Sequence, residues 1–138
     1  MRRMLTLAPV VALLAAACGG GAISVAAVAV GDCFDDPAET VVESLELIDC
    51  NEPHDNEAYA KLLLEQSVFP GDAIISEFAL DACLGPFEAY VGKSYAESSL
   101  DYAFLAPTAE GWNGSGDRTV TCFLYAADLS KLLGSSRG

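Results

Sequence analysis

The five cysteines of this 138-residue chain constrain its fold more than any other feature. Because five is an odd number, at least one cysteine cannot form a disulfide within the chain. Cys18 stands apart, since it follows an alanine run and precedes three glycines in the stretch LLAAACGGG at residues 13–21. The other four are spread over the remainder of the chain, at Cys33, Cys50, Cys83 and Cys122. The chain therefore divides into a leader that ends at one cysteine and a region that carries four.

The first 17 residues have the design of a secretory signal peptide. A short basic start is followed by an apolar run and then by small residues before the cysteine. The tetrapeptide Ala15-Ala16-Ala17-Cys18 resembles the bacterial lipobox, in which the cysteine is acylated and begins the mature chain, although leucine is more usual than alanine at its first position. We therefore predict a signal peptide over 1–17, a palmitate-bearing Cys18 and a short tether over 18–27.

Two other interpretations of the leader stay open. Ordinary cleavage near the alanine run would give a secreted protein without a lipid. An uncleaved anchor could run through to Val30, because AISVAAVAV at 22–30 is also apolar. The glycines at 19–21 and the short first run argue against a single span of about 20 residues. The favoured location is the cell membrane, with the domain lipid-anchored on its extracytoplasmic face.

The charge balance excludes one large class of partner. The chain has a net charge of −13, and its leader holds Arg2 and Arg3 but no acidic residue. A chain without residues 1–17 therefore has five basic side chains against 20 acidic ones, a net charge of −15. Such a surface repels the phosphates of nucleic acid and the headgroups of anionic lipids. We expect no binding to nucleic acid, and membrane attachment through the lipid alone.

The remaining region fits one packed domain, since 52% of the chain is apolar. Alternating or β-branched segments predict strands at 28–34, 41–50, 57–65, 100–106 and 118–126. The alternation of the second segment is imperfect, and a bulge would explain it. In the third of these we expect Ala58, Ala60, Leu62 and Leu64 on one face. In the fourth, Leu100, Tyr102 and Phe104 should share a face. In the fifth, Val120, Cys122 and Leu124 should lie together, with threonine and aromatic residues opposite. The segment 107–117 between the last two strands reads as a loop.

One helix is predicted over residues 70–92. Its expected core face carries Ile75, Ala79, Ala82, Cys83, Pro86 and Tyr90, and its solvated acidic face carries Glu77, Asp81 and Glu88. Asp72 suits the first turn. Pro86 should interrupt the helix after Leu84, because proline removes a backbone donor, and Gly92 can end it in a left-handed cap.

Four cysteines in a small exported domain indicate two disulfides, and three pairings are possible. We expect Cys33–Cys50 to close the first two strands and Cys83–Cys122 to join the helix to the sheet. The fold class is then α+β, with an antiparallel sheet of about five strands, one kinked helix packed on it and two disulfides. The domain should span residues 28–134, followed by a tail at 135–138.

Five short stretches also form an ordered set: GDCF at 31–34, DCNEPHDNEAY at 49–59, PGD at 70–72, YVG at 90–92 and the PT…W…GDRTVTCFL run at 107–124. Together they resemble the septum-formation domain of exported, membrane-tethered proteins of actinobacteria. The resemblance covers about residues 28–134. It implies a cell-envelope domain associated with formation of the division septum, with envelope or divisome proteins as partners, and it supplies no active site or cofactor.

The only histidine, His54, lies beside Asp55 and near Glu52 and Glu57. Imidazole and carboxylates at this spacing could bind a divalent cation or act in general-base chemistry. The alternative is a turn, in which Asp55 and Asn56 cap local amides and His54 hydrogen-bonds across a hairpin. A metal-dependent wall-binding protein or hydrolase centred on His54 is the alternative function.

Trp112 and Arg118 are the other candidate binding residues. Trp112 lies in a glycine-rich stretch, where an exposed aromatic side chain could anchor a partner or a glycan. Alternatively its ring folds back over the core while Arg118 pairs with a nearby carboxylate. No serine lies in a recognisable nucleophile elbow, and paired cysteines are not nucleophiles. We therefore expect a non-enzymatic domain that uses no cofactor and binds envelope proteins or the wall, through the Trp112 loop, through His54 and Asp55, or at a strand edge.

Overall fold

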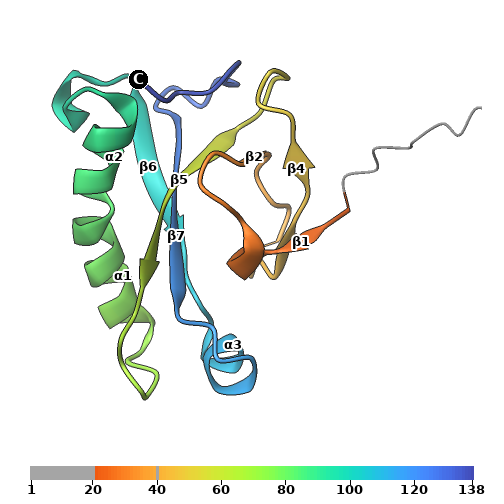
Figure 1. Ribbon diagram of the computed structural model, residues 1–138, viewed down its shortest axis with the longest axis vertical. Coiled ribbons are helices and arrows are strands. Elements are labelled where there is room, and N and C mark those ends of the chain that lie inside the picture. Colours follow the sequence, from red (N-terminus) through yellow and green to blue (C-terminus); the bar gives the residue numbers. More distant parts are fainter. Residues whose placement is uncertain (1–20, 40) are drawn as a thin grey trace, which may run out of the picture.

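The computed structural model describes residues 21–39 and 41–138, so the predicted signal peptide and Cys18 lie outside the described residues. Its centre is a five-stranded antiparallel sheet in the order β4-β2-β5-β7-β6. Helices α1 and α2 line one face, and the N-terminal segments lie on the other side (Figure 1). The predicted α+β architecture is confirmed. The strands are β2 (Cys33–Phe34), β4 (Leu47–Ile48), β5 (Asn56–Leu63), β6 (Leu100–Leu105) and β7 (Thr119–Ala126).

The predicted kinked helix is present as α1 (Asp72–Ala82) and α2 (Leu84–Val91). The break lies at Cys83, one residue before the predicted position. Pro86 is the third residue of α2, a place where a backbone N–H has no partner within the helix, so proline is tolerated there and the break falls before it. Gly92 ends α2 with φ 74° and ψ 17°, the left-handed cap that was expected.

Both predicted disulfides are present. Cys83–Cys122 joins the junction of the two helices to the middle of β7. Cys33–Cys50 joins β2 to the residue that follows Asp49, just beyond β4. The first bond therefore staples the helical layer to the sheet, and the second closes its β2–β4 edge.

The main core lies between the helices and the sheet. β7 points Val120, Cys122 and Leu124 toward the helices, and β6 points Leu100, Tyr102 and Phe104 the same way, as their alternation predicted. From the helices the buried residues are Ile75, Ala79, Cys83, Phe87, Tyr90 and Val91. Phe87 thus takes a core position that the helical pattern had not assigned.

The outward face of α1 differs from the purely acidic surface that was expected. Glu77 and Asp81 are exposed as predicted. Between and beside them, Ile74, Phe78 and Leu80 are also exposed. This face therefore mixes carboxylates with apolar side chains.

The expected face of β5 was wrong. Ala58 pairs with Phe123 and Ala60 pairs with Cys122, so Tyr59 is an extra residue that shifts the register. Ala60 consequently faces the helices, whereas Ala58 packs in a second core on the opposite side of the sheet. Tyr59 itself turns toward the helices, where its hydroxyl donates to the Cys83 carbonyl oxygen at 3.0 Å.

The predicted strand over 41–50 is two separate strands in different sheets. β3 (Ser44–Leu45) pairs with β1 (Ile23–Ser24), and β4 pairs with β2. The 3-10 helix η1 (Val25–Ala27) follows β1. These segments cover part of the sheet's second face with a small core of Val28, Phe34, Leu45 and Ala58. The predicted tether over 18–27 is therefore corrected, because residues 23–27 belong to the folded domain.

The predicted first strand is also shorter than residues 28–34. A turn occupies its first half, because Gly31 has φ 95° and the Asp32 side chain accepts a hydrogen bond from the Ala29 N–H at 2.8 Å. Only β2 remains extended. The 3-10 helix η2 (Tyr95–Glu97) precedes β6.

The predicted loop over 107–117 contains a short helix, α3 (Ala109–Gly114). Thr108 caps it, since its hydroxyl oxygen accepts the Gly111 N–H at 3.0 Å. Within residues 21–39 and 41–138, no helix has the length and apolar character that spanning a bilayer requires.

Candidate functional site

The four candidate binding residues lie in two separate places. His54 and Asp55 immediately precede β5, at the end of the sheet near residues 127–137. Trp112 lies in α3, and Arg118 immediately precedes β7. These four residues therefore do not form a single site.

Trp112 is part of the core rather than an exposed anchor. Its side chain is 2% exposed, and its ring packs edge-to-face against Phe69 with 5.6 Å between centroids. The Arg118 guanidinium lies 3.7 Å from the centroid of the Trp112 ring. It donates to the backbone carbonyls of Trp112 and Asp117, at 2.9 and 3.0 Å, instead of pairing with a carboxylate. The expectation that the ring folds back is confirmed, and the ring is not presented to a partner.

His54 is fully buried. Its Nδ1 lies 2.8 Å from the carbonyl oxygen of Glu52, and its backbone pairs with Leu132 through two hydrogen bonds of 3.1 and 2.8 Å. Because a carbonyl oxygen only accepts, Nδ1 carries the proton and Nε2 presents its lone pair. Within the described part of the chain, Nε2 has no hydrogen-bond partner.

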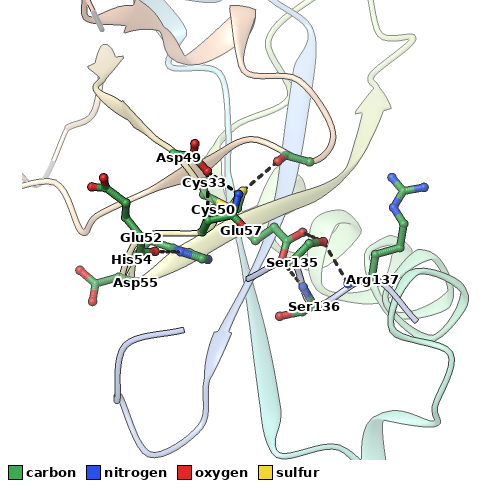
Figure 2. The surroundings of a disulfide bond; sticks show 12 residues. Cys33, Asp49, Cys50, Glu52, His54, Asp55, Glu57, Ser135, Ser136 and Arg137 are labelled. Atoms are coloured by element: carbon green, nitrogen blue, oxygen red, sulfur yellow. Dashed lines mark hydrogen bonds between the residues drawn. A yellow bond between two sulfur atoms is a disulfide. The ribbon is translucent and has the colours of Figure 1, made fainter. Parts of the chain in front are cut away.

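Glu57 is a buried carboxylate next to His54. It accepts hydrogen bonds from the Tyr90 hydroxyl at 2.6 Å, the Ser135 hydroxyl at 2.5 Å and the Ser136 N–H at 2.6 Å. Burial, and then this hydrogen bond to Glu57, raise the pKa of Tyr90. Figure 2 shows Ser135 and Ser136 beside the Glu57 carboxylate. The tail predicted at 135–138 therefore contacts the domain and closes this part of the core.

Asp55 belongs to an acidic network that ties β5 to the segment after β2. The Asp36 N–H donates to Asp55 Oδ2 at 3.0 Å, and the Asp55 N–H donates to Asp35 Oδ1 at 3.1 Å. The Asn56 side chain donates to Asp36 Oδ1 at 2.8 Å. Lys131 Nζ lies 2.6 Å from Asp35 and 2.9 Å from Asp55. Asp55 and Asn56 therefore hold a distant segment, and the predicted capping of local amides is wrong.

The pKa of Asp55 reflects this network. The hydrogen bond from the Asp36 backbone lowers it most, partial burial opposes that effect, and Lys131 lowers it further. Asp55 is consequently held in its ionised form at neutral pH.

A cleft of about 290 Å³ opens beside Asp55 on the sheet face that is turned away from the helices. Its floor comes from β5, β6 and β7. Asn56 on β5 and Asp101 on β6 flank Tyr125 of β7, and Ala103 of β6 lies opposite Phe123. The short Ala103 side chain leaves the hollow next to the Phe123 ring. We name this the Tyr125 cleft; it is lined by Asp36, Asp55, Asn56, Ala103, Phe123, Tyr125, Ala126, Leu129 and Ser130.

Leu129 forms an unusual part of the rim. It has φ 61°, the one positive φ among the non-glycine residues that the structure describes, and its side chain is 79% exposed. The turn is held by Asp128 Oδ1, which accepts from the Ser130 N–H at 3.0 Å and from the Ser130 hydroxyl at 2.6 Å. A left-handed backbone is unfavourable for leucine, and residues held in this way are often found at functional positions.

The Tyr125 cleft combines aromatic rings with carboxylates. Burial raises the pKa of Tyr125 first, and the negative charges of Asp101 and Asp36 raise it further. Among the carboxylates of the cleft, Asp55 has an ion-pair partner in Lys131, whereas Asp36 has none within the described part of the chain. A cation on an apolar stem suits this arrangement, because it contacts the face of an aromatic ring and pairs with a carboxylate at the same time.

Most residues of the cleft were not identified from the sequence, although one signal was present. The alternation of β7 had placed its aromatic residues, Phe123 and Tyr125, opposite the core-facing Val120, Cys122 and Leu124. Two aromatic side chains on the face without a predicted helix could have indicated a binding surface. Asp36, Ala103 and Leu129 come from distant segments and carried no comparable signal.

A comparison with protein-family models matched the family described as septum formation over residues 30–137. The matched range contains the five-stranded sheet, both helices of the main layer, both disulfides and the Tyr125 cleft. Comparisons with curated proteins and with solved structures found no match.

Proposed function

Since the chain belongs to the septum-formation family, which links it to septum formation, we propose that it acts there as a non-enzymatic binding domain. In this proposal a lipid on Cys18 holds the domain on the outer face of the cytoplasmic membrane. The Tyr125 cleft then binds a basic side chain of another cell-envelope protein. The observation that carries the proposal is the cleft itself, with its aromatic floor and its carboxylate rim.

Charge favours a basic occupant over other ligands. Asp36 and Asp55 line the cleft and Asp101 lies beside Tyr125, whereas Lys131 is already engaged by Asp35 and Asp55. An anionic group would meet these carboxylates, and a neutral group would leave Asp36 and Asp101 without a counter-charge. An arginine side chain offers a planar cation for Tyr125 and donors for a carboxylate. The exposed Leu129 side chain adds an apolar contact at the rim.

The leader and the disulfides support the proposed location. Two disulfides in one small domain are typical of exported proteins. The excess of carboxylates disfavours direct contact with anionic lipids, so a lipid on Cys18 supplies the attachment. Intact-mass measurement of the mature chain tests this part. Added acyl mass on a chain that begins at Cys18 supports it, and a chain without acyl mass contradicts it.

A binding role also accords with how the groups suited to acid–base chemistry are held. A general base must reach the proton that it removes, but the His54 ring is fully buried. The Glu57 carboxylate is buried as well and accepts three hydrogen bonds. The hydrolase alternative is tested by incubating the purified protein with cell-wall peptidoglycan, where release of soluble fragments that His54→Ala abolishes would contradict our proposal.

The ligand chemistry is tested by NMR with a defined probe. Blocked arginine, N-acetylarginine N-methylamide, should shift the signals of Tyr125, Phe123 and Ala103. Blocked citrulline has nearly the same shape without the charge and should not. Asp36→Asn combined with Asp55→Asn should abolish the shifts, whereas Glu65→Gln with Glu88→Gln, an equal change of net charge on exposed residues elsewhere, should keep them. Equal shifts with citrulline would contradict the proposed recognition of a cation.

The partner is sought in living cells with the anchor intact. A photo-crosslinking amino acid at Ser130, on the rim of the cleft, should give a protein adduct. The same amino acid at Gln66, an exposed position outside the cleft, is the control. The adduct should disappear in the Asp36→Asn and Asp55→Asn background. It should weaken with Leu129→Gly, because glycine adopts the left-handed backbone conformation without strain but lacks the apolar side chain that contacts the partner. Equal adducts from both positions, or an adduct that survives the loss of both carboxylates, would contradict a binding role for the cleft.

A further inference from the structure

We propose that opening the Cys33–Cys50 disulfide creates a zinc-binding site at the β2–β4 edge of the sheet, with Cys33, Cys50, His54 and Glu57 as its ligands. This inference is independent of the Tyr125 cleft. It rests on the orientation of one imidazole ring and on the groups that surround its free nitrogen.

The His54 ring is held in the manner of a metal ligand. Its Nδ1 donates to the Glu52 carbonyl oxygen at 2.8 Å, which leaves the lone pair on Nε2. Histidines that bind metals commonly donate their second ring nitrogen to a backbone carbonyl in this way, because the hydrogen bond fixes both tautomer and orientation. The ring is 0% exposed, and Nε2 has no hydrogen-bond partner among the described residues. A buried acceptor of this kind lacks the donor or cation that would satisfy it.

The other ligand atoms lie around this nitrogen. Cys33, His54 and Glu57 each offer one potential ligand atom, and these three atoms lie within 4.8 Å of one another. All three residues are buried. Cys33 and Glu57 are cross-strand partners in the β2–β5 pair, so the sheet itself holds them together. Cys50 is bonded to Cys33, so its sulfur lies next to the Cys33 sulfur, although Cys50 itself is not part of this three-residue group. Figure 2 shows the His54 and Glu57 side chains beside the disulfide.

This set of donors selects the metal. Two thiolates, one imidazole and one carboxylate make a four-ligand set of sulfur, nitrogen and oxygen, which suits tetrahedral Zn²⁺ better than Mg²⁺ or Ca²⁺. Glu57 already accepts three hydrogen bonds, and an ionised carboxylate has about four lone-pair sites, so one acceptor position is free.

The disulfide decides whether the site exists. Sulfurs bonded to each other are not thiolates, and it is the thiolate that binds a metal. An extracytoplasmic dithiol reductase would supply two electrons: its dithiol becomes a disulfide while Cys33 and Cys50 become thiols. Zn²⁺ then replaces the two thiol protons, which pass to solvent. In this proposal the reduced domain binds zinc and the oxidised domain does not.

The second disulfide provides an internal contrast. Cys83 and Cys122 are both 0% exposed, and no histidine accompanies them, because His54 is the only histidine of the chain. They also belong to no group of three or more potential metal ligands within the described residues. Zinc binding that requires Cys33 and Cys50 but not Cys83 and Cys122 would therefore indicate a specific site. Unspecific binding to thiols would depend on both pairs.

The test uses the full chain with Cys18→Ser in every variant, so that only the two pairs contribute thiols. After treatment with a phosphine reductant and removal of excess ZnCl₂, bound zinc is counted by mass spectrometry, and CoCl₂ serves as a probe of thiolate ligation by its absorption. We expect one metal ion per chain in the reduced protein and none in the oxidised protein. Cys83→Ala with Cys122→Ala should keep the site, and Cys33→Ser with Cys50→Ser should lose it. His54→Ala should weaken binding by at least about tenfold.

Several outcomes would overturn the proposal: equal zinc binding by the oxidised protein, binding that survives Cys33→Ser with Cys50→Ser, or binding that His54→Ala leaves unchanged. If reduction unfolds the chain, backbone NMR spectra decide the question. A built site then predicts that one equivalent of zinc restores the folded spectrum, because binding and folding are coupled. A reduced chain that neither binds zinc nor refolds with it would contradict the site.

Discussion

The two disulfides of this domain have the same chemistry and opposite surroundings. Cys83–Cys122 lies inside the apolar layer between helices and sheet, and both of its residues are fully buried. Cys33–Cys50 lies at the β2–β4 edge, where His54, Glu57 and the segment 135–137 surround it and Cys50 is partly exposed. The first bond has only structural neighbours, whereas the second has neighbours with ligand and hydrogen-bonding chemistry. The role of each disulfide in this domain therefore depends on what packs against it.

The largest expected difference between the two bonds is in their rate of reduction. A reductant reaches Cys50 after a local opening of the edge, but it reaches the Cys83–Cys122 bond only when the core opens. Opening free energies that differ by about 3 kcal/mol correspond to rates that differ by about 100-fold. Alkylation of free thiols during timed treatment with a reductant, followed by peptide mapping, measures both rates. Equal rates would remove the distinction between the two regions.

Loss of each disulfide should also cost different amounts of stability. The loops that they close differ, since the sequence separation is 39 for Cys83–Cys122 and 17 for Cys33–Cys50. Chain entropy alone gives about 4 and about 3 kcal/mol for the two bonds. Removing the buried pair also leaves a gap in the core, which increases its cost. Urea unfolding of Cys83→Ala with Cys122→Ala, against Cys33→Ala with Cys50→Ala, measures the difference. A larger loss for the second pair would contradict this ordering.

A matched pair of tyrosines compares the two regions more finely. Tyr59 donates to the Cys83 carbonyl oxygen at 3.0 Å, and Tyr90 donates to the Glu57 carboxylate at 2.6 Å. Hydrogen bonds to carboxylates are the stronger kind, and removing the donor leaves a buried acceptor with one partner fewer. We expect Tyr90→Phe to cost about 1.5–3 kcal/mol and Tyr59→Phe about 0.5–1.5 kcal/mol of unfolding free energy. Equal losses would mean that the hydrogen bond to Glu57 stabilises the fold no more than the hydrogen bond to the Cys83 carbonyl oxygen.

The sequence predicted the elements that have a local pattern and missed those that depend on contacts between distant segments. The kinked helix and the faces of β6 and β7 follow from local periodicity. The pairing of the cysteines does not, because the sequence permitted three pairings, and the expected one was only favoured by the position of Cys83 on the core face of the helix. The face of Ala58 was missed because a bulge at Tyr59 changes the parity of β5 without a local signal. Strands of two residues, such as β1 and β3, exist through pairing between distant segments and leave no periodic pattern.

Only part of the candidate site could be identified from the sequence. Asp55 was identified from its neighbours in the sequence, and it does line the Tyr125 cleft. The cleft itself depends on Ala103, Leu129 and Asp36, which only the tertiary fold brings together. His54 was expected in a turn, and its burial follows from backbone pairing with Leu132, 78 positions later in the chain by residue number. Contacts over such separations decide the site, and local patterns do not contain them.

The smallest expected effect concerns acid stability at the polar edge. The folded pKa of Asp55 lies below the ordinary value of 3.8, chiefly through the Asp36 backbone hydrogen bond. As pH falls, the unfolded chain therefore takes up a proton at Asp55 before the folded chain does, so the stabilisation is complete above the unfolded pKa and is lost as pH falls through the folded pKa. Asp55→Asn should flatten the dependence of the melting temperature on pH below about pH 4. Asp81→Asn, an exposed change on α1 near the other disulfide, is the control and should leave the profile as it is. If both variants follow the wild-type profile, the network around Asp55 contributes nothing to acid stability.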